Sequence, residues 1–230
     1  MAALGDDVTA GAYAGEPAQR RALRESLLPL VALEARDPPL RAKLLGAAKD
    51  YLGGEAHALD PSFRAVALQV AVQSSDIAFI ARLKDTLLKS SDPQYKRDIS
   101  IAIGGGDTPS LADEALAIAT SPGIGPTESM NIIFSLARES GSRDRTTSFA
   151  RNNFARLMDL FPGFRRPRVV EMYKDYCTAE EAANIEAFFR PKLEAMGGGE
   201  LELAQTEEQI GLCVALRSAR AAEIAAALAN

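Results

Sequence analysis

Prolines that can open helices recur along this chain about one helix length apart, at Pro17, Pro38, Pro61, Pro93, Pro109 and Pro126. Proline suits the first turn of a helix, because its missing N–H would have no partner there in any case. Apolar residues between these prolines follow helical spacing, and no segment shows the alternation of a strand. The spacing therefore predicts an all-α chain, in which antiparallel helix pairs stack as a HEAT- or armadillo-like array with a right-handed superhelical course.

N-cap residues, glycines and prolines give approximate ends for the predicted helices. We expect helices over about residues 16–35, 40–52, 143–160, 178–196 and 200–228, a short helix around 169–176, and further helices that begin near 61, 76, 93, 109 and 126. We also expect residues 1–14, which are rich in Ala, Gly and Asp, to form a flexible lead-in to a single helical-repeat domain over residues 15–230.

Helical spacing also predicts which residues are buried. In the first helix the predicted buried face holds Leu23, Leu27, Leu30 and Val31, and Pro29 predicts a kink or a later start. In the helix that begins near 76 it holds Ile77, Ile80, Leu83, Leu87 and Leu88. In the helix that begins at Pro109 it holds Leu111, Ala115 and Leu116.

Composition excludes several classes of protein. The chain is 47% hydrophobic and 25% charged, so it should fold, and its net charge of −5 disfavours general nucleic-acid binding. No apolar run reaches the roughly 20 residues that cross a bilayer, so we expect no membrane contact. Two cysteines do not make a disulfide framework, so we expect Cys177 and Cys213 to be reduced and structural, and the chain to be cytoplasmic.

Few residues could carry out catalysis. His57 is the only histidine, which excludes the HExxH zinc site and most histidine-based mechanisms, so we expect an ordinary solvated side chain. The run Gly104-Gly105-Gly106-Asp107 could be mistaken for a dinucleotide loop. Pro109 stands where that motif needs its third glycine, and no strand precedes the run. A helix end followed by an N-cap at Thr108 explains these residues better.

Two groups of arginines are candidate anion contacts. One is the cluster Arg165, Arg166 and Arg168, and the other is Arg143, Arg145 and Arg151 near a helix start. Both could instead be ordinary solvated residues. Arginine suits a carboxylate because its guanidinium donates in a bidentate fork, and a helix N-terminus adds a favourable dipole, which favours the second group. Glu180 and Glu181 are explained by the capping box that begins at Thr178, so we expect no catalytic residue.

From about residue 101 onward the chain resembles the C-terminal helical domain of zinc aminopeptidases related to aminopeptidase N, puromycin-sensitive aminopeptidase and the endoplasmic-reticulum aminopeptidases. Residues 104–111, GGGDTPSL, resemble an inter-helix turn of that family. Residues 151–157, RNNFARL, resemble its "ENW-x-x-L" helix with Phe for Trp. Residues 178–189 resemble its helix that begins T-x-E and ends F-F, and residues 208–210 resemble the start of its terminal helix. That terminal helix continues with Cys213-Val214-Ala215-Leu216, which departs from the family's Asn–Ile–x–Trp–Leu run.

The resemblance implies a cup of helices that closes over a thermolysin-like catalytic domain and helps to accommodate the peptide. It also implies that zinc belongs to that catalytic domain, because HExxH and the GAMEN-type motif are absent from this sequence. The expected partners are the rest of the same polypeptide and peptide substrates. Two alternatives remain: an independent HEAT-like scaffold that binds another protein, and a stand-alone helical enzyme, which the scarcity of catalytic groups disfavours.

Overall fold

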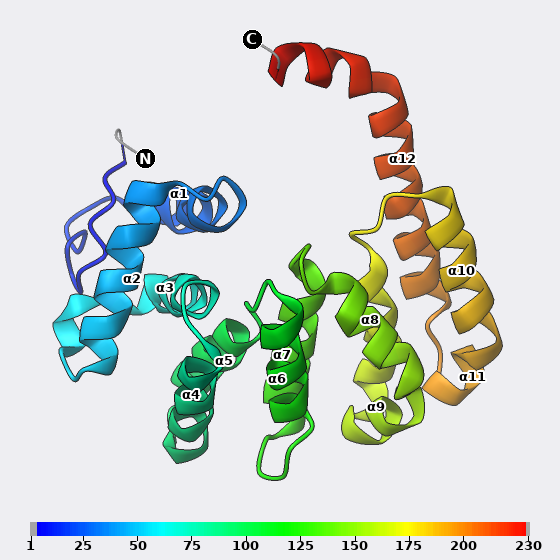
Figure 1. Cartoon of the computed structure of the whole chain (residues 1–230), viewed down its shortest axis with the longest axis horizontal. Helices are drawn as coiled ribbons and strands as arrows, with labels where there is room; N and C mark the ends of the chain where they lie inside the picture. Colours follow the sequence, from blue (N-terminus) through cyan, green and yellow to red (C-terminus); the bar gives the residue numbers. More distant parts are fainter. Residues whose placement is uncertain (1–3, 229–230) are drawn as a thin grey trace. The chain divides into compact units, whose positions relative to one another are not determined.

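The structure is a computed structural model that describes residues 4–228, and every regular element in that range is helical (Figure 1). The α-helices are α1 (Ala18–Pro29), α2 (Pro38–Leu52), α3 (Pro61–Gln73), α4 (Ile77–Lys89), α5 (Pro93–Ile103), α6 (Pro109–Ala119), α7 (Pro126–Arg138), α8 (Arg143–Asn152), α9 (Phe154–Leu160), α10 (Ala179–Phe189), α11 (Leu193–Met196) and α12 (Glu200–Leu228). A π-helical turn covers Leu30–Glu34, and 3₁₀ segments cover Ala56–Ala58, Gly163–Tyr173 and Arg190–Lys192. The all-α prediction is confirmed.

The chain divides into two compact units, Met1–Arg145 and Thr146–Asn230. In the first unit, α2 packs on α3, α4 on α5 and α6 on α7, so consecutive helices form pairs. The second helices of these pairs also contact one another in the order α3, α5, α7, and α4 contacts α6 (Figure 1). This repeated pairing is the packing of a helical-repeat-like fold.

Side-chain N-caps open several helices of the first unit, including the cap predicted at Thr108. The Asp37 carboxylate accepts from the Leu40 N–H at 2.9 Å, and the Asp60 and Asp92 carboxylates each accept at 2.9 Å from an N–H two residues on. Thr108 Oγ1 accepts from the Leu111 N–H at 3.4 Å. Proline follows each of these caps, as the sequence predicted, because a first-turn residue needs no N–H donor.

The buried face of α1 differs from the predicted one. Leu23 and Leu30 are 49% and 53% exposed, whereas Arg24, Leu28 and Ala32 are buried. The helix continues through Pro29 into the π-helical turn, so the departure from α geometry lies directly after the proline. The burial of Arg24 is possible because its guanidinium is fully engaged: Nε donates to the Leu4 carbonyl at 2.8 Å and Nη2 to Glu16 at 2.9 Å.

Burial confirms most of the other predicted faces. Ile80, Leu83 and Leu87 of α4 are buried, but Ile77 and Leu88 at the edges of that stripe are about half exposed. In α6, all three residues predicted to be inward, Leu111, Ala115 and Leu116, are buried. The predicted buried stripe of α4 was therefore too wide, because a helix buries only the side chains that point toward its neighbours.

The second unit differs most from the predicted element boundaries. The predicted helix over 143–160 is interrupted at Asn153, and the short piece expected around 169–176 is a 3₁₀ segment, Gly163–Tyr173. The predicted helix over 178–196 is interrupted by the 3₁₀ segment Arg190–Lys192, because Pro191 cannot donate a backbone hydrogen bond inside a helix. The long helix α12 packs against α10 and against the 3₁₀ segment Gly163–Tyr173.

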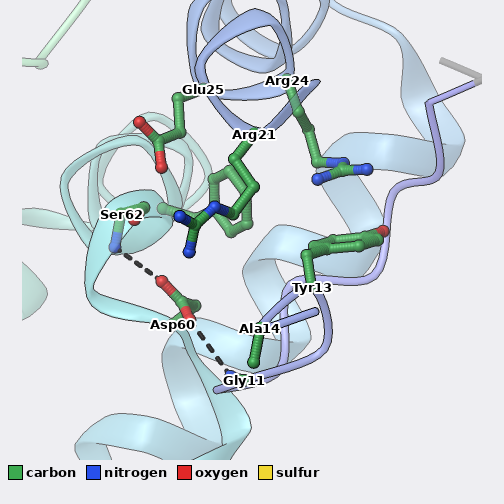
Figure 2. Close-up of a pocket in the computed structure, with 9 residues that line it drawn as sticks. Gly11, Tyr13, Ala14, Arg21, Arg24, Glu25, Asp60 and Ser62 are labelled. Atoms are coloured by element: carbon green, nitrogen blue, oxygen red, sulfur yellow. Dashed lines mark hydrogen bonds between the residues drawn. The ribbon is translucent and has the colours of Figure 1, made fainter. Parts of the chain in front are cut away.

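Residues 4–14, part of the lead-in over 1–14 that the sequence predicts to be flexible, are mostly exposed or half-buried but make specific contacts with the loop that enters α3. Val8 is 3% exposed, and its carbonyl accepts from the Asp60 N–H at 2.7 Å. The Ala10 N–H donates to the His57 carbonyl at 3.0 Å, and the Gly11 N–H donates to the Asp60 carboxylate at 3.2 Å (Figure 2). These bonds hold the segment against the loop that enters α3. Residues 1–3 of this predicted lead-in lie outside the described residues.

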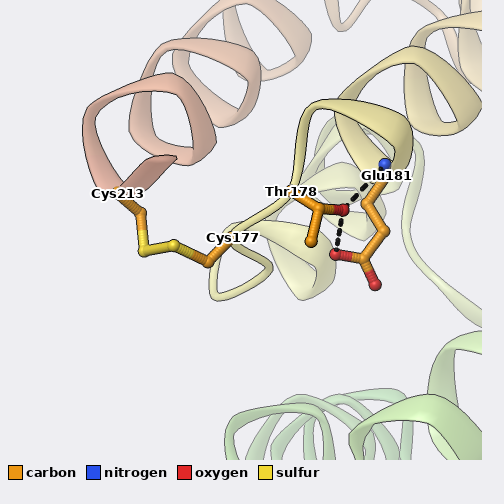
Figure 3. Close-up of a disulfide and its surroundings, with 4 residues drawn as sticks. All are labelled: Cys177, Thr178, Glu181 and Cys213. Carbon is orange, nitrogen blue, oxygen red and sulfur yellow. Dashed lines mark hydrogen bonds between the residues drawn. A yellow bond between two sulfur atoms is a disulfide. The ribbon is translucent and has the colours of Figure 1, made fainter. Parts of the chain in front are cut away.

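Cys177 and Cys213 form a disulfide, which corrects the expectation that both are reduced. Cys177 directly precedes the N-cap of α10, and Cys213 lies in α12 (Figure 3). Because α10 and α12 pack side by side, the two Cα atoms come within 5.4 Å, which is the usual separation in a disulfide. Two cysteines far apart in sequence carry no signal of this pairing, which arises from the packing of the two helices.

Candidate functional site

The Gly-rich turn after α5 packs directly on the helices around it. A Cβ atom at Gly104 would lie 2.4 Å from the Ile132 carbonyl oxygen, and one at Gly105 would lie 2.2 Å from Cγ of Gln69. Gly104 is the C-cap of α5 and Thr108 is the N-cap of α6, which confirms the predicted helix end and N-cap. The glycines therefore serve close packing, and the turn places Asp107 beside charged residues from other elements.

Glu139, at the end of α7, is the centre of a polar network in the first unit. Gln69 Nε2 donates to Glu139 Oε1 at 2.8 Å, and Gln73 Nε2 donates to Oε2 at 3.2 Å. Arg41 Nη1 in turn donates to Gln73 Oε1 at 2.9 Å and to the Ala32 carbonyl at 3.0 Å. We call Arg41, Gln69, Gln73 and Glu139 the Glu139 network. It joins the starts or ends of α2, α3 and α7.

The network holds a carboxyl group that titrates near neutrality. Burial raises the pKa of Glu139 to about 7, and the Asp107 and Glu34 carboxylates act in the same direction. The hydrogen bond from Gln69 and the charge of Arg36 oppose this rise in pKa. Arg36 is itself paired with Asp107, at 2.7 Å between Nη2 and Oδ2. The arrangement can gain or lose one proton at an inter-helix junction.

Arg143 and Arg145, two of the predicted anion contacts, lie at the end of the first unit and already have partners. Arg143 Nε donates to the Ala137 carbonyl at 3.2 Å. Arg145 makes a bidentate pair with Asp113, at 2.5 and 2.9 Å. Both side chains of that pair are about half exposed, so a carboxylate ligand could reach Arg145 only in competition with Asp113.

Arg151, the third member of that group, belongs to the second unit. Its guanidinium carbon lies 5.3 Å from the ring centre of Tyr173 and 5.6 Å from that of Phe188. Its Nε atom is buried and has no hydrogen-bond partner among the described residues. Burial raises the pKa of Tyr173 to about 12, and the hydroxyl of that tyrosine donates to the Thr147 carbonyl at 3.0 Å. Within the part of the chain that the structure describes, Arg151 therefore keeps a buried donor atom without a hydrogen-bond partner.

The cluster Arg165, Arg166 and Arg168 lies in the 3₁₀ segment of the second unit. Arg168 pairs with Glu171 at 3.0 Å, and Arg166 Nε donates to the Phe161 carbonyl at 3.4 Å. The guanidinium carbon of Arg165 lies 5.3 Å from the ring centre of the exposed Phe164. These contacts all lie within the segment and its neighbours in sequence. That the three arginines contact a peptide stays a prediction.

The N-cap of the capping box predicted at Thr178 is present, and the Glu181 side chain bonds to the hydroxyl of Thr178. Thr178 Oγ1 accepts from the Glu181 N–H at 3.2 Å and donates to the Glu181 carboxylate at 2.9 Å (Figure 3). Among the described residues no group of three or more His, Cys, Asp or Glu side chains could hold a metal ion. No described helix has the length and apolar character needed to cross a membrane.

The Glu139 network is the arrangement that sequence analysis missed. Its members come from three separate helices, and none of them belongs to a motif. The one available signal was the triple-glycine turn, whose packing on Gln69 marks a close approach of backbone and side chain.

A family model described as the ERAP1-like C-terminal domain matches residues 3–211. The match covers the first unit from residue 3, the second unit up to residue 211, and all the candidate residues described above. Comparison with curated proteins finds no matching relative.

Proposed function

The chain belongs to the family of ERAP1-like C-terminal domains, and from this premise we propose that it is the non-catalytic C-terminal domain of a zinc aminopeptidase. In this role it packs against the catalytic domain of its own polypeptide and shapes the cavity through which peptides reach the active site. The family match over residues 3–211 is the observation that carries the proposal. Zinc would be held by the catalytic domain, because HExxH is absent from this sequence.

Several features of the chain support this role over catalysis by the chain itself. Its only histidine, His57, is exposed in a short 3₁₀ segment, and Glu180 and Glu181 lie in the first turn of α10, where a capping box explains them. The repeated helix pairs of the first unit provide broad packed surfaces, as expected of a domain that binds other chain segments. The same match favours this proposal over an independent HEAT-like scaffold.

We propose Arg151, in the second unit, as a contact for the C-terminal carboxylate of a long peptide, and Arg145, in the first unit, as a separate candidate for a contact of the same kind. Arg151 has a buried Nε without a hydrogen-bond partner among the described residues, so a ligand carboxylate could pair with it only if the side chain turned toward solvent. Arg145 is half exposed and is held by Asp113 in the geometry that a carboxylate ligand would need. Exchange of one carboxylate for another at Arg145 would keep its charge paired.

Kinetics of the full-length parent enzyme test this proposal. Arg145→Ala and Arg151→Ala should each lower kcat/KM for a long peptide about tenfold, while kcat/KM for a single-residue amide stays unchanged. Arg217→Ala, at an exposed position on α12, is the matched control. Equal losses on both substrates, or no loss on either, would contradict the carboxylate contact.

A second experiment tests the domain's role without any point variant. The isolated chain is added to the separately produced catalytic part of the parent enzyme. Restored hydrolysis of long peptides supports the proposed role. An isolated chain that neither binds the catalytic part nor alters its activity would favour the independent scaffold.

The disulfide bears on the compartment in which the chain folds. The sequence predicts a cytoplasmic location, but cytosolic reductants keep most thiols reduced. The Cys177–Cys213 bond therefore favours folding in an oxidising compartment. The bond does not support the cytoplasmic location, which stays a prediction.

A further inference from the structure

A cavity of about 190 Å³ lies in the first unit, between the residue 11–14 segment, α1 and the start of α3 (Figure 2). It is not part of the Glu139 network, and none of the arginines predicted as anion contacts lines it. An engineered cavity of about 150 Å³ can hold benzene, whereas sites for drug-sized ligands start near 300 Å³. The size therefore suits a ligand of roughly one amino acid.

Two walls of the cavity are formed by side chains that are held by contacts within the chain. On one side the buried guanidinium of Arg24 stacks on Tyr13, 3.3 Å from the ring centre, and is held by Glu16 and the Leu4 carbonyl. On the other side the Asp60 carboxylate accepts from the Ser62 and Gly11 N–H groups. Because these groups are already satisfied, they fix the shape of the cavity without needing a ligand.

Three polar side chains in the cavity are not engaged in this way. Arg21 and Glu25 extend from α1 toward the start of α3, one helical turn apart (Figure 2). Neither side chain forms a hydrogen bond or ion pair with a described residue, and the Ser62 hydroxyl likewise has no hydrogen-bond partner there. The cavity thus offers one cation, one carboxylate and one hydroxyl to a ligand.

We propose that this cavity binds a free α-amino acid. Its carboxylate pairs with Arg21 through the bidentate fork that suits carboxylates, and its ammonium group pairs with Glu25. Its side chain lies against Phe63 and the ring of Tyr13, which supply the apolar part of the lining. A purely anionic ligand would leave Glu25 and Asp60 opposed to its charge, and a purely cationic one would face Arg21.

This proposal does not rest on the proposed aminopeptidase role, because it follows from the cavity alone. The two can fail separately: ligand binding is measured on the 230-residue chain, whereas the domain's role is measured on the parent enzyme. Free amino acids are, however, what an aminopeptidase releases, so a site of this kind would sense product.

Nuclear magnetic resonance of the isotopically labelled chain tests the proposal, with L-leucine as the probe. We expect L-leucine to shift the amide signals of Gly11, Ala14 and Ser62 with a Kd of about 1–10 mM. N-acetyl-L-leucine lacks the ammonium group and L-leucinamide lacks the carboxylate, so each should bind at least about tenfold more weakly.

Two variants identify the charged groups involved. Arg21→Gln and Glu25→Gln should each weaken L-leucine binding about tenfold or more, and both positions are exposed, so the fold should persist. Arg97→Gln and Glu55→Gln are the matched controls, at exposed positions outside the cavity. The proposal is overturned if L-leucine shifts no amide around the cavity, if the blocked analogues bind equally well, or if the Arg21 and Glu25 variants bind like the controls.

Discussion

Arg64 of α3 and Asp98 of α5 form an ion pair that is almost completely buried, with side chains 8% and 4% exposed and an Nη2–Oδ2 distance of 2.7 Å. Arg64 Nη1 also donates to the Tyr51 hydroxyl at 3.2 Å, and Gln94 Nε2 donates to the other oxygen of Asp98 at 2.8 Å. The guanidinium carbon lies 4.7 Å from the ring centre of Tyr95. Both charges are thus fully compensated where α3 and α5 meet.

Removing one partner of this pair should destabilise the chain strongly. Asp98→Ala leaves the Arg64 cation buried without an anion, which should cost about 3–5 kcal/mol of unfolding free energy. Urea unfolding measures the loss. The control is Asp113→Ala, which breaks the half-exposed pair with Arg145 and should change the unfolding free energy little, because solvent screens that pair. Equal effects of the two variants would show that the Arg64–Asp98 pair is not buried in solution.

The packing of α6 gives a second prediction. Leu116 is 3% exposed, so Leu116→Ala removes buried methyl groups and leaves a cavity, at a cost of about 2–5 kcal/mol. Leu23→Ala, on α1, is the matched control, because Leu23 is 49% exposed and its truncation should change stability by less than about 0.5 kcal/mol. Thermal or urea unfolding of both variants checks the difference. If Leu116→Ala loses as little unfolding free energy as Leu23→Ala, Leu116 is not buried in solution.

Local signals in the sequence were sufficient for the helix starts and for much of the core. An N-cap at Asp37, Asp60, Asp92 or Thr108 acts on backbone groups two or three residues away, so adjacent residues determine it. Periodicity also located Leu116 correctly. It placed Leu23 on the wrong side because the burial of Arg24 depends on partners from another segment, Leu4 and Glu16.

Contacts between distant segments were the ones that sequence analysis could not predict. The Cys177–Cys213 bond depends on how α10 and α12 pack, and the Glu139 network depends on how α2, α3 and α7 meet. The cavity beside Arg21 depends on the path of residues 11–14, which the sequence suggested was flexible. In each case the residue types are ordinary, and only the tertiary arrangement gives them a role.

The disulfide should contribute substantially to the stability of the second unit. It closes a loop with a sequence separation of 36 residues, for which the chain-entropy estimate is about 3–4 kcal/mol. Unfolding followed with and without dithiothreitol should show this loss, and a Cys177→Ser, Cys213→Ser double variant should be insensitive to the reductant. Titration of two free thiols in the native, unreduced chain would show that the bond does not form.

Glu139 should make stability depend on pH in a direction opposite to that of a salt-bridged carboxylate. Its pKa in the folded chain is raised from 4.5 to about 7, so between these values the folded state binds more protons than the unfolded state. The unfolding free energy contributed by this residue therefore falls as pH rises from about 4.5 to 7, and stays low above that range.

Glu139→Gln removes the titration and keeps an oxygen that can accept from Gln69. Between pH 5 and pH 8, the unfolding free energy of this variant should rise by about 1–2 kcal/mol relative to that of the unmodified chain. This figure is smaller than the full pKa shift would give, because Glu139 is partly exposed. Urea unfolding of both proteins at the two pH values measures the gain. Glu55→Gln, at an exposed position, is the control and should show no pH-dependent difference. Parallel pH profiles for the Glu139 variant and the unmodified chain would mean that Glu139 titrates normally in the folded state.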